Sequence, residues 1–250
     1  MRLLLMSNGS APGGEYLAHA MSTLRELLAG VDRIAFIAYA QLGLEEHTRV
    51  VAAAMAQLDV ELVGVHRSHR PASIVEAADA VFVGGGNAFR LLAALHRYDL
   101  IDPIRAAVRD GAPYLGSSAG TNMACPSLRT TNDMPIVEPP TFAALNLVPF
   151  QINPHYPATE VMGRHLGETR DHRIAEFLEE NDVPVLGLQE GSWLQVDHDR
   201  ARLGGVAGAR LFRREEAPVD LKVGADLSDL LTTLGTFDSP GRGCDDRGTR

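Results

Sequence analysis

The chain has little cysteine, no long apolar run and no excess of positive charge, and each shortage excludes a class of protein. Its two cysteines, Cys125 and Cys244, are too few for a disulfide framework and lack the paired spacing of a zinc or iron–sulfur site. The apolar run at residues 1–6 is too short for a signal peptide core or a bilayer span, and no later run reaches spanning length. We therefore expect a cytoplasmic protein in a reducing compartment, with no membrane contact.

Acidic residues outnumber basic ones, 32 to 23, and the two signs are interspersed along the chain. The resulting net charge of −9 disfavours binding to nucleic acid or to an anionic membrane surface. A small molecule or a peptide is the expected partner. The oligomeric state is left open, with a homodimer among the options.

Apolar runs of strand length alternate with stretches of helical period, which predicts a three-layer α/β fold with a mostly parallel central sheet. The expected strands span residues 3–6, 33–38, 60–65, 80–83, 113–115, 185–188, 193–196, 211–213 and 221–223. The expected helices span residues 16–28, 45–57, a short stretch from Pro71, 88–95, a stretch from Asp102-Pro103 to about Gly111, a short stretch ending at Cys125-Pro126, and 171–180. Residues 133–157 are rich in proline and are expected to form loops. We expect one domain over residues 1–234, followed by a polar tail at 235–250 whose one aromatic residue, Phe237, is too little to anchor it.

A candidate nucleophile lies in Gly116-Ser117-Ser118-Ala119-Gly120, which matches the G-x-S-x-G elbow directly after an expected strand and before an expected helix. A serine hydroxyl needs a base to remove its proton and donors to stabilise the oxyanion. The amide of Ala119 could supply one donor, and Gly85 and Gly86, at the end of a neighbouring strand, could supply others. The glycine run is also consistent with a tight turn or a phosphate loop, but it lacks the residues that phosphate binding needs.

Nine histidines compete for the role of base, and most of them lie on expected helices or in polar turns. His155 differs because it lies in a proline-flanked loop after an apolar segment, where catalytic side chains gather. An acid between serine and histidine would reproduce the chain order of the α/β-hydrolases. Asp133 and Glu138 are the two candidates.

Several blocks of the sequence resemble the peptidase E family of aspartyl dipeptidases, and together they cover nearly everything except the tail. The blocks that carry the resemblance span residues 3–8, 83–87, 116–120, 124–126, 129–137, 151–155, 167–170 and 190–193. The resemblance implies a fold like that of the class I glutamine amidotransferases and hydrolysis of dipeptides with an N-terminal aspartate, without metal or cofactor.

Carried over by position, the resemblance implies that Ser118 is the nucleophile, His155 the general base and Asp133, rather than Glu138, the acid that orients it. Cys125 lies seven residues beyond the elbow serine, so a glutaminase would lack its thiol nucleophile. Two alternatives stay open: a peptidase like the relative that degrades cyanophycin, and a catalytically idle binding module on the same scaffold.

Arginine is the expected partner of the substrate's side-chain carboxylate, because a planar guanidinium pairs with both carboxylate oxygens. The family implies Arg170, although without the resemblance an ion pair of this arginine with Glu168 or Asp171 would be the preferred interpretation. Asn87 is a further substrate-binding candidate, and Glu190, at a strand end, could bind the free amine. The weaker competitors of Arg170 are Arg129, Arg164 and Arg173.

Overall fold

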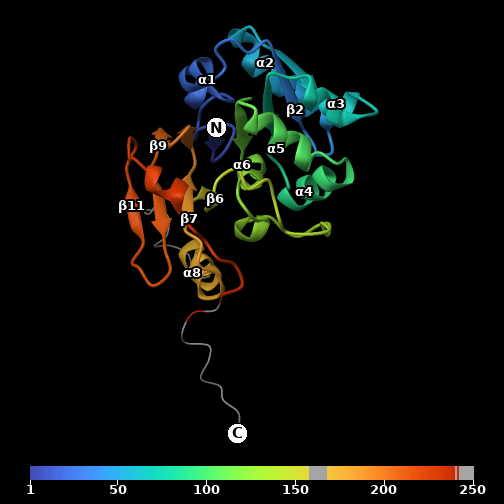
Figure 1. Cartoon of the computed structure of the whole chain (residues 1–250). Coiled ribbons are helices and arrows are strands. Elements are labelled where there is room, and N and C mark those ends of the chain that lie inside the picture. Colours follow the sequence, from blue (N-terminus) through green and yellow to red (C-terminus); the bar gives the residue numbers. More distant parts are fainter. Residues whose placement is uncertain (158–167, 240, 242–250) are drawn as a thin grey trace.

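The computed structural model describes residues 1–157, 168–239 and 241, and its strands form two sheets (Figure 1). The larger sheet has seven strands, and five of them are parallel, as the alternation of strands and helices predicts. In spatial order its strands are β3 (Glu61–Gly64), β2 (Arg33–Ile37), β4 (Ala80–Val83), β5 (Tyr114–Ser117), β1 (Arg2–Met6), β8 (Ser192–Asp197) and β9 (Arg200–Gly205). β8 and β9 extend the sheet in the antiparallel direction.

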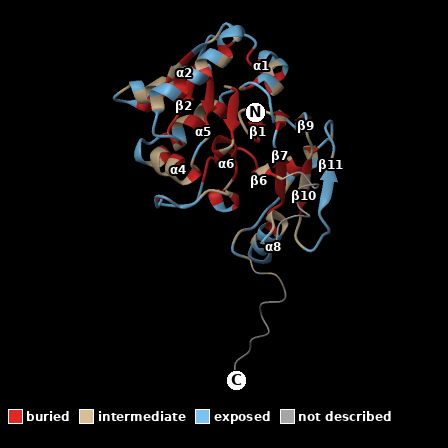
Figure 2. Cartoon of the chain, turned by 180° about the vertical axis from the view of Figure 1, so that it is seen from behind, coloured by how far each residue is buried: buried red, intermediate tan, exposed pale blue. Residues whose placement is uncertain are grey.

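Helices cover both faces of this sheet because alternate side chains of each strand point to opposite sides. Leu3 and Leu5 of β1 belong to one apolar core, and Leu4 and Met6 belong to the other. The first core packs against α3 (Pro71–Glu76), α4 (Ala88–Arg97), α5 (Ile101–Arg109) and α6 (Ala119–Ala124). The second packs against α1 (Met21–Leu27) and α2 (Leu44–Met55). Figure 2 shows the strands as a buried layer between exposed helix faces, so the predicted three-layer α/β fold is confirmed.

The smaller sheet consists of four strands gathered with α8 (Arg170–Glu180) on one side of the molecule (Figure 1). In spatial order they are β11 (Val219–Leu221), β10 (Ala209–Phe212), β7 (Val185–Gln189) and β6 (Gln151–Tyr156). A third apolar cluster, which includes Ile174 of α8 and Val185 of β7, fixes the helix on this sheet. Short 3-10 helices complete the fold: η1 (Ala18–Ala20), η2 (Ala56–Leu58), η3 (Val65–Arg67), η4 (Leu128–Thr130) and η5 (Ser228–Thr232).

Three local features differ from the sequence-based expectations. β9 was not expected, and β6 replaces part of the expected loop at residues 133–157. α5 begins at Ile101, ahead of the expected start at Asp102-Pro103, and Pro103 lies within its first turn. A proline is tolerated there since first-turn amides have no intrahelical acceptor.

The C-terminal segment at residues 236–239 packs against the molecule, so the expected polar tail does not begin at residue 235. Thr236 forms a β-bridge with Asp182, and the ring of Phe237 packs edge-on against Phe177 of α8. Backbone hydrogen bonds and one aromatic contact thus hold residues 236–239 against the molecule, although their polar composition predicted no such packing. The rest of the expected tail, residues 240 and 242–250, lies outside the described residues, as does residue range 158–167.

The helices that the structure describes are all too short or too polar to cross a lipid bilayer.

Candidate active site

Ser118 lies at a sharp turn between β5 and α6, with φ 53° and ψ −110°. Such a positive φ is strained for a residue with a side chain, and it is the conformation expected of a nucleophile elbow. The glycines on either side of the elbow let the chain turn so tightly. A Cβ on Gly116 would lie 2.7 Å from the carbonyl oxygen of Gly120, and one on Gly120 would lie 2.0 Å from that of Val83. The amide of Ser118 donates to the carbonyl of Met6, which fixes the turn on the sheet.

His155 lies within hydrogen-bond distance of this serine, with 2.8 Å between its Nε2 and Ser118 Oγ. Its strand, β6, is irregular between Asn153 and Tyr156, and His155 itself has φ 55°. The buried hydroxyl of Ser7 accepts a hydrogen bond from the His155 amide and donates one to Leu188. The structure thus brings the predicted serine and histidine together from different sheets.

Glu190, and not Asp133, lies beside the other ring nitrogen of the histidine. Its Oε1 is 2.9 Å from His155 Nδ1, and Gly191, with φ 82°, turns the chain directly after it. Asp133 Oδ2 instead accepts a hydrogen bond of 2.7 Å from the Ala88 amide at the start of α4. The hydrogen bonding therefore contradicts the prediction that Asp133 orients the imidazole, because a helix N-terminus, with its free amides, holds that carboxylate elsewhere. Glu190, predicted to bind the substrate's free amine, instead lies against the histidine.

A cavity of about 660 Å³ opens onto the serine and the histidine. It is lined by Gly9, Tyr16, Gln41, Gly43, Glu46, His47, Val50, Gly85, Gly86, Ser117, Ser118, Asp133 and His155. Gly85 lies against the nucleophile, since a Cβ added to it would lie 3.2 Å from Ser118 Cβ. Within the described part of the chain, the amides of Gly85 and Gly86 donate no hydrogen bond. Ala119 begins α6, where an amide has no intrahelical acceptor, so the predicted oxyanion donors are available to a ligand.

A second cavity, of about 190 Å³, contains Arg170. It is lined by Arg129, Thr130, Thr131, Asn132, Asp133, Asn153, Arg170, Arg173, Ile174 and Phe177. Arg170 is partly buried, and its Nη1 donates to Asn132 Oδ1. No carboxylate of the described residues pairs with it, including Glu168 and Asp171. Burial, followed by the positive charge of Arg173, lowers the pKa of the Arg170 guanidinium.

The competing arginines differ from Arg170 in having acidic partners. Arg129 pairs with Asp238 at 2.7 Å, and Arg173 pairs with Glu168 at 2.8 Å. Arg164 lies outside the described residues. Among the arginines that line this cavity, Arg170 is the one without an acidic partner in the described part of the chain.

Asn87 uses its side-chain amide within the protein. Its Oδ1 caps α4 by accepting from the Arg90 amide at 3.0 Å, and its Nδ2 donates to the Met134 carbonyl at 3.0 Å. The structure therefore gives it a role in positioning the loop that carries Asp133, and it does not line either cavity.

Cys125 is fully buried, and its Sγ accepts a hydrogen bond from the Ile152 amide. Burial raises the pKa of this thiol to about 12. The thiol is therefore neutral and inaccessible, which removes it as an alternative nucleophile.

Sequence reasoning missed two residues of the site. Ser7 fixes the backbone of His155, and Tyr16 lines the larger cavity with its hydroxyl hydrogen-bonded to Ser117. Burial raises the pKa of Tyr16 to about 12, so its phenol stays neutral. Both residues border the turn-rich segment after β1. Turn-forming residues are a local pattern, so they do not indicate which later part of the chain packs against the segment.

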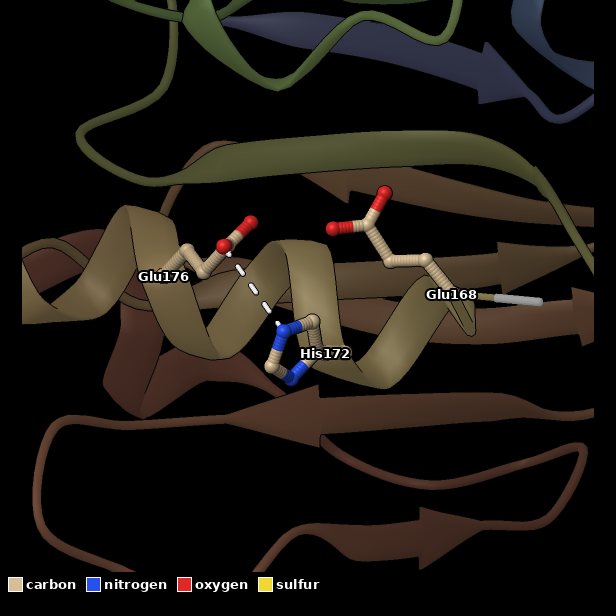
Figure 3. Close-up of side chains that lie close together, drawn as sticks. All are labelled: Glu168, His172 and Glu176. Atoms are coloured by element: carbon tan, nitrogen blue, oxygen red, sulfur yellow. Dashed lines mark ion pairs between the residues drawn. The ribbon is translucent and has the colours of Figure 1, made fainter.

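A group that could hold a metal ion lies on one side of α8, where Glu168, His172 and Glu176 come together (Figure 3). All three side chains are exposed, and Glu168 is already paired with Arg173. None of the three lines the cavity at Ser118.

Comparison with known proteins places this geometry in a wider context. The model of a family described as Peptidase family S51 matches residues 3–204. Peptidase E of Streptomyces coelicolor is 56% identical over 239 residues, which are 96% of this chain and 98% of that protein. A probable alpha-aspartyl dipeptidase of Drosophila melanogaster is 44% identical over 232 residues, 92% of this chain and 97% of that protein. The crystal structure of a peptidase from an acI-B1 actinobacterium superposes with a TM-score of 0.66 at 17% identity, covering 90% of this chain and 96% of that one.

Proposed function

The chain belongs to peptidase family S51, and from this premise we propose that it is a serine dipeptidase that hydrolyses dipeptides with an N-terminal aspartate. The observation that carries the proposal is the partly buried guanidinium of Arg170. It has no acidic partner among the described residues, and its cavity borders Asp133, which also lines the cavity of Ser118 and His155. An unpaired cation close to a nucleophile suits a substrate with a negative charge near its scissile bond. The name of the Drosophila melanogaster relative, a probable alpha-aspartyl dipeptidase, agrees with this substrate class.

In the proposed reaction, Ser118 Oγ attacks the carbonyl carbon of the N-terminal aspartate while His155 Nε2 takes the hydroxyl proton. Glu190 holds the proton of Nδ1 and stabilises the imidazolium that forms. The amides of Gly85, Gly86 and Ala119 donate to the oxyanion. His155 then protonates the leaving amine as the C–N bond breaks, and water hydrolyses the acyl-enzyme by the same steps in reverse.

Substrate selection would fall to Arg170, which pairs with the side-chain carboxylate of the aspartate. An Asn-Xaa dipeptide has the same shape but a neutral amide, so it would gain far less from the guanidinium. The reaction, as proposed, takes place in the cytoplasm, in keeping with a buried, unpaired thiol at Cys125.

The test is to measure kcat/KM for Asp-Leu and Asn-Leu with the wild type, Arg170→Met and the matched control Arg173→Met. A hydrogen bond to a charged group contributes about 1.5–3 kcal/mol, so Arg170→Met should reduce the preference for Asp-Leu about 10- to 100-fold. Arg173→Met should change the preference little, because Arg173 is already paired with Glu168. An equal fall for both dipeptides with Arg170→Met would show that another residue reads the aspartate.

A further inference from the structure

We propose that Asp133 binds the α-ammonium group of the substrate and so restricts the enzyme to peptides with a free N-terminus. The inference rests on the proposed function, and it gives a role to a carboxylate that the hydrogen bonding removes from the histidine. Asp133 then contacts substrate directly while Glu190 contacts the histidine.

The position of Asp133 suits this role because it is the residue shared by the linings of the two cavities. In an Asp-Xaa dipeptide, one α-carbon carries the scissile carbonyl, the side-chain carboxylate and the ammonium group. With the carbonyl at Ser118 and the carboxylate at Arg170, the α-carbon lies between the two cavities, and its ammonium group can reach Asp133, which lines both.

Only one of the two carboxylate oxygens of Asp133, Oδ2, is held by a hydrogen bond within the described residues. Oδ2 accepts from the Ala88 amide at 2.7 Å, and the Asp133 amide donates to Thr131 Oγ1 at 3.3 Å. Within residues 1–157, 168–239 and 241, Oδ1 accepts no hydrogen bond. The Ala88 contact holds the carboxylate in place, so the free oxygen is a positioned acceptor for a cation.

The other acidic side chains near the nucleophile already have partners. Both carboxylate oxygens of Glu46 accept hydrogen bonds from Arg49, at 2.6 and 3.0 Å. Glu190 Oε1 is 2.9 Å from His155 Nδ1, and Glu190 does not line the larger cavity. Of the two acids that line the larger cavity, Asp133 is therefore the one with a free oxygen for the ammonium group.

The test compares Asp133→Asn with wild type on two substrates that differ only in the amine. Asp-Leu carries the ammonium group, and succinyl-leucine has hydrogen in its place. The asparagine oxygen can still accept from Ala88, so the variant removes the charge and keeps the helix contact. Glu138→Gln, an exposed acid of the same loop, is the matched control, and thermal unfolding checks that all proteins fold.

We expect Asp133→Asn to lower kcat/KM for Asp-Leu about 10- to 100-fold, mainly through KM, and to leave succinyl-leucine unchanged. If succinyl-leucine turns over too slowly, its inhibition constant against Asp-Leu serves instead. Glu138→Gln should behave as wild type on both substrates. An equal loss on both substrates, or no loss on either, would overturn the role of Asp133.

A wild-type measurement covers the case in which the variant does not fold. The kcat/KM for Asp-Leu should fall as the substrate amine loses its proton, at about pH 8. The kcat/KM for succinyl-leucine, which has no amine, should not show this fall. Identical profiles would overturn the inference while leaving Asp-Leu hydrolysis, and with it the proposed function, intact. Failure of the wild type to cleave Asp-Leu would overturn both.

Discussion

Replacing Glu190 with glutamine tests whether this residue is the acid that supports His155. The carboxylate lies 2.9 Å from Nδ1, so it can hold the Nδ1 proton and leave Nε2 free to take the proton of Ser118. Glutamine has nearly the same shape but no charge. The variant therefore isolates the stabilisation of the imidazolium that forms as the serine attacks.

The size of the loss follows from the exposure of the pair. In a Ser-His-Asp protease, changing the buried acid to its amide costs about 10⁴-fold in kcat, because the amide stabilises the wrong tautomer. Here the side chains of His155 and Glu190 are 40% and 49% exposed. A glutamine at this position can rotate to keep its oxygen on Nδ1, and solvent screens the lost charge. We therefore expect kcat for Asp-Leu to fall by about 10²- to 10³-fold, with KM little changed.

The assay is steady-state hydrolysis of Asp-Leu and succinyl-leucine by Glu190→Gln, with Asp133→Asn alongside. Glu190→Gln should slow both substrates equally, because the histidine acts on every acyl group. Asp133→Asn should discriminate between them. Activity of Glu190→Gln within tenfold of wild type, or a loss confined to Asp-Leu, would refute the assignment of Glu190 to the histidine.

Three further outcomes are expected. Ser118→Ala should lose turnover by a factor on the order of 10⁶ and lose labelling by a fluorophosphonate, with the melting temperature unchanged; residual activity within tenfold of wild type would refute the nucleophile. Cys125, whose raised pKa of about 12 keeps it a neutral thiol below that pH, should resist iodoacetamide at pH 8 in the native protein and react after unfolding, as read from its tryptic peptide by mass spectrometry. Deleting residues 236–250 should lower the melting temperature by about 2–6 °C, because it removes the packing of Phe237, worth about 1–2 kcal/mol; an unchanged melting temperature would show that this packing contributes nothing.

The parallel strands were predictable because they are buried on both faces and read as continuous apolar runs. β9 was missed because its arginines, Arg200 and Arg202, alternate with buried residues on an exposed edge, where no continuous run forms. The division of the strands into two sheets could not be predicted from the sequence either. It depends on pairings such as β6 with β7, between segments that lie far apart in the sequence and are joined by no local signal.

The elbow serine and its histidine could be predicted because glycine spacing and a position at a strand end are local properties. The acid beside the histidine could not, because the expected order of serine, acid and histidine left Asp133 and Glu138, the family resemblance selected Asp133, and Glu190 follows the histidine in the chain. A signal was present in Gln189-Glu190-Gly191, an acid between a strand and a tight turn. Which carboxylate reaches an imidazole is decided by the packing of β6 on β7, which a sequence pattern does not contain.

The division of the site between two sheets has a consequence for how the enzyme loses activity under stress. Ser118 follows β5 of the seven-stranded sheet, His155 lies in β6 of the four-stranded one, Glu190 lies in the turn between β7 and β8, and Ser7 joins the two sheets. The chain's one tryptophan, Trp193, lies in β8 of the larger sheet and packs against the second core, so its fluorescence reports mainly on that sheet. Whenever denaturant opens the smaller sheet first, catalysis stops while the fluorescence remains native. Turnover and tryptophan emission, followed side by side, therefore measure the cooperativity between the two halves of the fold.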